Sequence, residues 1–150
     1  MSSLLAAVAV CLVVASCGSD DGGSNAATGD EAAVAVAVKR YLTALGNLDA
    51  AGVCESLTEE AQQQVVQQSG SSQIRCAEVF RLGFATMGEP QKRALADQRD
   101  LEPFSIEVDG TSATGRLQWN SQTSEFSAEQ VEGGWKLSSP GTAEIVTGQG

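Results

Sequence analysis

The sequence contains no histidine among its 150 residues. Histidine is the commonest general base near neutral pH and the commonest metal ligand. Its absence excludes a serine–histidine–aspartate triad and a zinc site of the usual kind. Basic residues are also few, since nine lysines and arginines stand against nineteen acids, for a net charge of −10. Because a nucleic-acid binder needs a basic face to release counterions from phosphate, we expect no nucleic-acid partner.

A glycine-rich phosphate-binding loop is also lacking. Catalysis by a pair of carboxylates is one route that the composition allows, and the candidates are Asp97, Asp100, Glu102 and Glu107. Nothing in the sequence places two of them in one pocket. We therefore expect no enzyme, no catalytic residue, no metal and no cofactor, and we keep a pocket-carboxylate hydrolase or isomerase as the alternative.

Long hydrophobic runs are limited to one, at residues 4–15. As a helix these twelve residues would span roughly 18 Å, which is too short for a hydrocarbon core of about 30 Å. The run is typical of a secretory signal peptide. Residues 18–29 contain no large apolar side chain, so the segment 17–29 is predicted to be a flexible tether with a reach of roughly 20 Å.

The junction Val14-Ala15-Ser16-Cys17 resembles the lipobox of bacterial lipoproteins, in which the cysteine is acylated and becomes the mature N-terminus. The resemblance implies a signal peptide at 1–16, lipidation at Cys17 and an extracytoplasmic protein that is anchored to the cell membrane by lipid. Each buried CH₂ of an acyl chain contributes about 0.8 kcal/mol, so two or three chains hold a protein stably. The first residues, Met1-Ser2-Ser3, lack the usual basic charge, and a plain secretory signal remains the alternative.

Beyond the leader and Cys17, the only cysteines are Cys54 and Cys76. Outside the cytoplasm an even pair in one domain indicates a disulfide. Such a loop stabilises a fold by about 3 kcal/mol in the chain-entropy model. Reactive thiols are disfavoured, because the pair has neither CxxC spacing nor a histidine partner.

Apolar residues recur at helical spacing from Asp30 to Leu45, after a Thr28–Glu31 capping box. Asp49 is expected to cap a short helix that ends at Leu57, and Thr58 a third helix that ends near Gln68. That third helix has a thin apolar seam and many glutamines. A fourth helix is predicted over 73–87, and residues 91–101 form either a short helix or an irregular link.

From Pro103 the apolar period changes to two, which indicates strands. Phe104, Ile106 and Val108 are predicted to face the core together. Turn signals at 109–110, 120–121 and 132–134 divide the segment into a four-stranded antiparallel meander, with a bulge near Glu129 because Val131 is out of phase. The tail, 141–150, either adds a short strand at 143–146 or frays.

Helices with a disulfide followed by such a meander resemble the nuclear transport factor 2-like cone fold, as carried by small actinobacterial lipoproteins. The matching pieces are Val38–Leu45, Asp49–Cys54, Cys76 and Val131–Leu137, in this order. The resemblance implies an α+β domain over 30–140, in which helices pack on a curved antiparallel sheet that can enclose an apolar pocket. Enzymes of that family place acids, tyrosine or histidine in the pocket, and here only Tyr41 corresponds.

These observations predict a non-catalytic binding or accessory domain in the cell envelope. Its partner would be an envelope protein or a small apolar ligand, and the candidate pocket lining is Tyr41, Phe84, Trp119 and Trp135. The same four aromatic residues are also the ordinary content of a small core. A structural spacer between membrane and envelope is the remaining alternative.

Overall fold

A computed structural model describes residues 29–71 and 73–141. The leader, most of the tether, Cys17, Thr28 and the tail from residue 142 lie outside these ranges. Helix α1 (Gly29–Gly46) carries the predicted apolar stripe, and its large members are at most 2% exposed: Val34, Val38, Tyr41, Leu42 and Leu45. This confirms the first helix and its buried face.

The next two helices begin at the predicted caps. Helix α2 (Ala50–Glu55) starts after Asp49, whose carboxylate accepts a 3.1 Å hydrogen bond from the Gly52 amide. Helix α3 (Glu59–Gln68) starts after Thr58, whose hydroxyl accepts a 3.2 Å bond from the Ala61 amide. Both side chains satisfy amides that a helix N-terminus leaves without a partner.

Helix α4 (Cys76–Thr86) begins three residues later than predicted, and Met87 and Gly88 separate it from helix α5 (Glu89–Asp97). Residues 91–101 are therefore mostly helical, and a 3₁₀ turn, η1 (Gln98–Asp100), continues α5. Pro90 lies in the first turn of α5, where a missing N–H costs no intrahelical bond. This resolves the open choice in favour of a helix.

The sheet follows the helices in the chain, as predicted. Strands β1 (Phe104–Asp109), β2 (Ser112–Trp119), β3 (Gln122–Val131) and β4 (Gly134–Ser139) pair antiparallel in the order β1-β2-β3-β4. In the tight β2–β3 turn, Asn120 and Ser121 both take positive φ, 49° and 66°. Positive φ at both central residues is the geometry that matches strand twist in two-residue hairpins. The α+β class and the meander are confirmed.

The prediction that Phe104 faces the core is wrong. Phe104 pairs with Arg116 and Glu107 with Thr114, so β1 contains one more residue than β2 over this stretch. Ser105 takes φ of 50° at that bulge. The extra residue moves Phe104 to the outer face, where it is 39% exposed, while Ile106 and Val108 stay on the inner face and pack against the core.

The bulge near Glu129 is also wrong. The pairing of β2 with β3 is regular from Trp119–Gln122 to Ser112–Glu129, and Glu129 pairs in register with Lys136 on β4. The irregularity lies on β4, where Ser138 is the extra residue between Leu137 and Ser139. Val131 lies on the outer face at the end of β3, whereas Phe126 and Ala128 lie on the inner face. The alternation along β3 is therefore regular, and no bulge is needed to explain the position of Val131.

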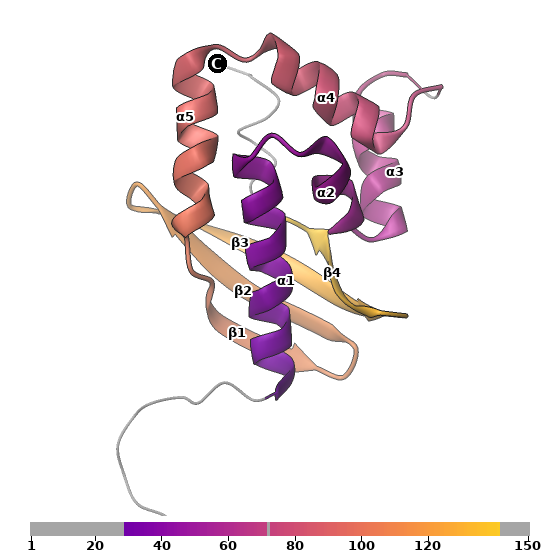
Figure 1. Cartoon of the computed structure of the whole chain (residues 1–150). Coiled ribbons are helices and arrows are strands. Elements are labelled where there is room, and N and C mark those ends of the chain that lie inside the picture. Colours follow the sequence, from indigo (N-terminus) through magenta and orange to yellow (C-terminus); the bar gives the residue numbers. More distant parts are fainter. Residues whose placement is uncertain (1–28, 72, 142–150) are drawn as a thin grey trace, which may run out of the picture.

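Helix α1 crosses in front of the sheet, and the other helices gather around its C-terminal half (Figure 1). Contacts of α1 reach both edge strands, β1 and β4. The helices and the sheet enclose a single core, to which the sheet contributes Ala113, Leu117, Phe126, Ala128, Trp135 and Leu137. The buried apolar residues of the described ranges run from Val34 on α1 to Leu137 on β4.

Gln98 is an exception in this packing. Its side chain is 1% exposed, and neither its amide nitrogen nor its amide oxygen has a hydrogen-bond partner among the described residues. The turn that carries it packs against α1. Burying an amide without partners costs about 1–3 kcal/mol.

Replacing Gln98 with methionine, which has nearly the same shape, should remove that cost. We expect Gln98→Met to raise the free energy of unfolding by about 1 kcal/mol in urea denaturation. Gln63→Met, at an exposed position of α3, is the matched control and should change little. A loss of stability in Gln98→Met alone would show that the amide does have a partner.

Candidate functional site

A cleft of about 380 Å³ lies between α1, α3, α4 and the end of β4. Its floor is made of buried side chains: Tyr41, Leu57, Ala61 and Phe80. Val65, Val79 and Gly83 form half-buried walls. The volume is near the lower end of the roughly 300–1,000 Å³ that small-molecule sites occupy.

Uncharged polar groups surround this floor. They are the amides of Gln64 and Gln68 on α3 and the hydroxyls of Ser69, Ser138 and Ser139. Not one of the thirteen described lining residues, which also include Pro140, is an Asp, Glu, Lys or Arg. The cleft therefore combines an apolar floor with a rim that donates and accepts hydrogen bonds without bearing a full charge.

The thin apolar seam of α3 is the origin of the cleft. Ala61 is the only fully buried residue of α3, and Val65, on the same face of the helix, is half-buried. On the facing helix α4, Gly83 has no side chain, and a Cβ placed there would meet nothing within 4 Å. The bulge at Ser138 and the following Pro140 close the third side. Small residues on two facing helices thus leave the space open.

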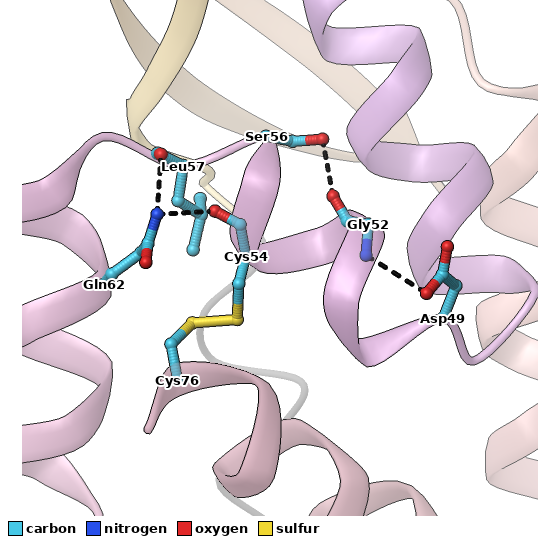
Figure 2. Close-up of a disulfide and its surroundings, with 7 residues drawn as sticks. All are labelled: Asp49, Gly52, Cys54, Ser56, Leu57, Gln62 and Cys76. Atoms are coloured by element: carbon cyan, nitrogen blue, oxygen red, sulfur yellow. Dashed lines mark hydrogen bonds between the residues drawn. A yellow bond between two sulfur atoms is a disulfide. The ribbon is translucent and has the colours of Figure 1, made fainter.

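The N-terminal end of α3 is held firmly. Cys54 on α2 and Cys76 at the start of α4 form the predicted disulfide, with a Cα–Cα distance of 6.1 Å. The Gln62 amide donates 2.8 Å and 3.2 Å bonds to the carbonyls of Cys54 and Leu57, as Figure 2 shows. These contacts hold the start of α3 against the end of α2, which the disulfide ties to α4.

A wider and more open hollow lies on the other side of α3. Glutamines and Val66 of α3 line it, together with Ile74 and Arg75, and its volume is about 760 Å³. Gln62, one of its lining residues, is already bonded to backbone carbonyls. Because this hollow opens more broadly to solvent and Cys76 is the only buried residue among its described lining, the less open cleft is the stronger candidate site.

Of the four predicted pocket residues, Tyr41 is the only one that lines the cleft. Phe84 lies behind it, with its ring 5.8 Å from that of Phe80, and Trp135 is buried in the core. Trp119 is half-buried on β2. Sequence reasoning missed the contribution of α3, although the thin seam between Leu57 and Val65 was a visible signal of an incompletely filled face.

The four candidate acids do not form a site in the described ranges. Asp97, Asp100, Glu102 and Glu107 are all exposed, and none lines either hollow. Glu102 pairs with Lys39 of α1. Within residues 29–71 and 73–141, no three side chains of the metal-binding types lie close enough to hold an ion.

Among those same residues, none of the helices has the length and apolarity needed to span a bilayer. Comparison with known proteins identifies no relative: no protein family, no curated protein and no solved structure matches this chain.

The disulfide generates a stability prediction. It closes a loop with a sequence separation of 22 residues. Replacing both Cys54 and Cys76 with alanine should lower the free energy of unfolding by about 3 kcal/mol, because the unfolded chain gains the freedom of that loop. Urea denaturation would measure the change, and wild-type protein refolded under reducing conditions is the control. Equal stability of the oxidised and reduced proteins would contradict the prediction.

Proposed function

We propose that this protein is a non-catalytic binding domain of the cell envelope. Acyl chains on Cys17 hold it at the outer face of the cell membrane, and the tether over 17–29 separates the domain from the bilayer. The cleft between α1, α3, α4 and β4 receives a small ligand that is at least partly apolar. The domain adopts a nuclear transport factor 2-like cone, in which helices pack on an antiparallel meander.

The observation that carries the binding role is the chemistry of the cleft. An apolar floor with a few polar groups at the rim is the usual lining of a ligand site. General acid–base chemistry requires a titratable group within reach of the reacting atoms. Tyr41 is the only ionisable side chain in the described lining, and it is 2% exposed on the floor. This arrangement favours binding over the alternative of a pocket-carboxylate enzyme.

Two features support the compartment. The disulfide between Cys54 and Cys76 is of a kind that persists outside the cytoplasm and is rare inside it. The small residues Ala15 and Ser16 precede Cys17, as the acylation signal requires. The order of helices and strands, with the disulfide between α2 and α4, supports the cone fold.

The anchor is tested on the full-length chain in a bacterial host. We expect the native protein to fractionate with membranes and its mature N-terminus to be an acylated Cys17 by mass spectrometry. Cys17→Ser should abolish acylation and membrane retention through lipid, whereas Cys11→Ser, inside the leader, should leave both unchanged. An unmodified mature N-terminus at any other residue would overturn the anchor.

The cleft is tested with Gly83, because a side chain there enters free space. Gly83→Leu should fill the cleft and reduce binding of the uncharged dye Nile red at least tenfold, measured by fluorescence titration. Ala85→Leu, on an exposed position of the same helix that does not line the cleft, is the matched control and should bind like wild type.

Residues 18–150 are used for this titration, because acyl chains would bind the dye themselves. A thermal transition that matches the acylated protein establishes beforehand that this chain folds. Leucine also favours a helix more than glycine does, so Gly83→Leu should keep its stability. If Nile red does not bind wild type, or binds Gly83→Leu as tightly as it binds Ala85→Leu, the proposed binding role is overturned. The structural spacer is then the better explanation.

A further inference from the structure

We propose that the ligand of the cleft is an uncharged single-chain amphiphile with a hydroxyl-bearing head group. The inference rests on the proposed binding role of the cleft and adds the chemical class of the ligand. Three properties of the site carry it: the depth gradient of its lining, the absence of a counter-ion and the position of the C-terminal end of α3.

The lining changes from apolar to polar with depth. Tyr41, Leu57 and Phe80, on the floor, are at most 6% exposed, whereas Gln64 and Gln68 are exposed at the rim. A ligand that matches this gradient has an apolar body at one end and a polar group at the other. Apolar burial contributes about 25 cal/mol per Å², so the body supplies most of the affinity and the head supplies orientation.

The rim selects a head group that both donates and accepts hydrogen bonds. The carboxamides of Gln64 and Gln68 offer donors and acceptors, and so do the serine hydroxyls of Ser138 and Ser139. Gln64 and Gln68 are four residues apart, so they lie on the same face of α3. Hydroxyl groups on the ligand match such a mixed set, because each hydroxyl donates one bond and accepts others.

A charged head is disfavoured on two grounds. No lining side chain carries a charge that would pair with it, and a partly buried charge without a partner is costly. An anion is disfavoured further, because α3 ends at Gln68 on the rim and helix C-termini carry partial negative charge. The chain also has a net charge of −10.

The size of the cleft limits the body to one chain. About 380 Å³ is near the lower end of the range of small-molecule sites. Gly83 and Val79 on α4 face Ala61 and Val65 on α3 across it. Helix α3 directly follows α2 in the chain, and the disulfide ties α2 to α4, so the crosslink opposes a wider separation of α3 from the start of α4.

The test compares three ligands that share a twelve-carbon chain and differ in the head: 1-monolauroylglycerol, laurate and dodecyltrimethylammonium. Residues 18–150 are titrated with each ligand by calorimetry, below the concentration at which it forms micelles. We expect the glyceride to bind wild type at least tenfold more tightly than laurate or the ammonium compound. Gly83→Leu should weaken the glyceride at least tenfold, and Ala85→Leu should not.

A charge placed on the rim gives a gain of binding that misfolding cannot mimic. Gln68→Lys should strengthen laurate at least tenfold, because the ammonium group supplies the missing counter-ion, and it should weaken the glyceride. Gln67→Lys introduces the same charge one residue away, where the side chain lines the wider hollow on the other side of α3 and not the cleft. This control should change neither affinity by more than about twofold.

The outcomes separate the two proposals. If the three ligands bind equally, or if a charged ligand binds most tightly, while Gly83→Leu still blocks the cleft, then the ligand class is overturned and the binding role survives. If Gln68→Lys leaves the preference for the glyceride unchanged, the rim does not read the head group and the inference falls. If neither the lipids nor Nile red bind, both proposals fall together.

Discussion

Three consecutive residues, Ser56 to Thr58, connect the two halves of this fold. Leu57 forms a parallel bridge with Leu137, in which the Thr58 amide donates to the Leu137 carbonyl and the Leu137 amide donates to the Ser56 carbonyl, both at 2.9 Å. The Ser56 hydroxyl closes α2 by donating to the Gly52 carbonyl, and the Thr58 hydroxyl caps α3. Helices and sheet are therefore joined by backbone hydrogen bonds as well as by apolar packing.

The cleft follows from that connection. Because the bridge fixes Leu57 against β4 and the disulfide fixes Cys54 against Cys76, α3 starts at a set position between them. Its own side chains contribute little to the core, since Ala61 is its one fully buried residue. A helix held at its start by its neighbours can tolerate an unfilled face, and the space beside Val65 is the result. The site thus depends on contacts that lie outside its own lining.

Much of this arrangement was predictable from the sequence. The stripe of α1, the caps at Asp49 and Thr58, the cysteine pair and the period-two segments all depend on spacing within one element or on simple counting. The bulges at Ser105 and Ser138 could not be predicted from the sequence, because the position of an extra, unpaired residue in one strand depends on how that strand pairs with its neighbour. The composition of the cleft was missed for the same reason. Aromatic residues drew attention as pocket candidates, but tertiary packing placed Phe84 and Trp135 in the core and gave the walls to glutamine, serine and glycine.

The Ser105 bulge has a consequence for contacts between molecules. A regular edge strand presents a row of unpaired amides and carbonyls that can template the addition of a strand from another chain. Here Ser105 interrupts the regular pleat of β1 two residues after Pro103, which has no amide hydrogen to donate. At the opposite edge, the bridge from Leu57 pairs with β4 at Leu137. Each border of the sheet is thus interrupted at one point, which opposes cross-β polymerisation, and this protection matters most at high local protein concentration.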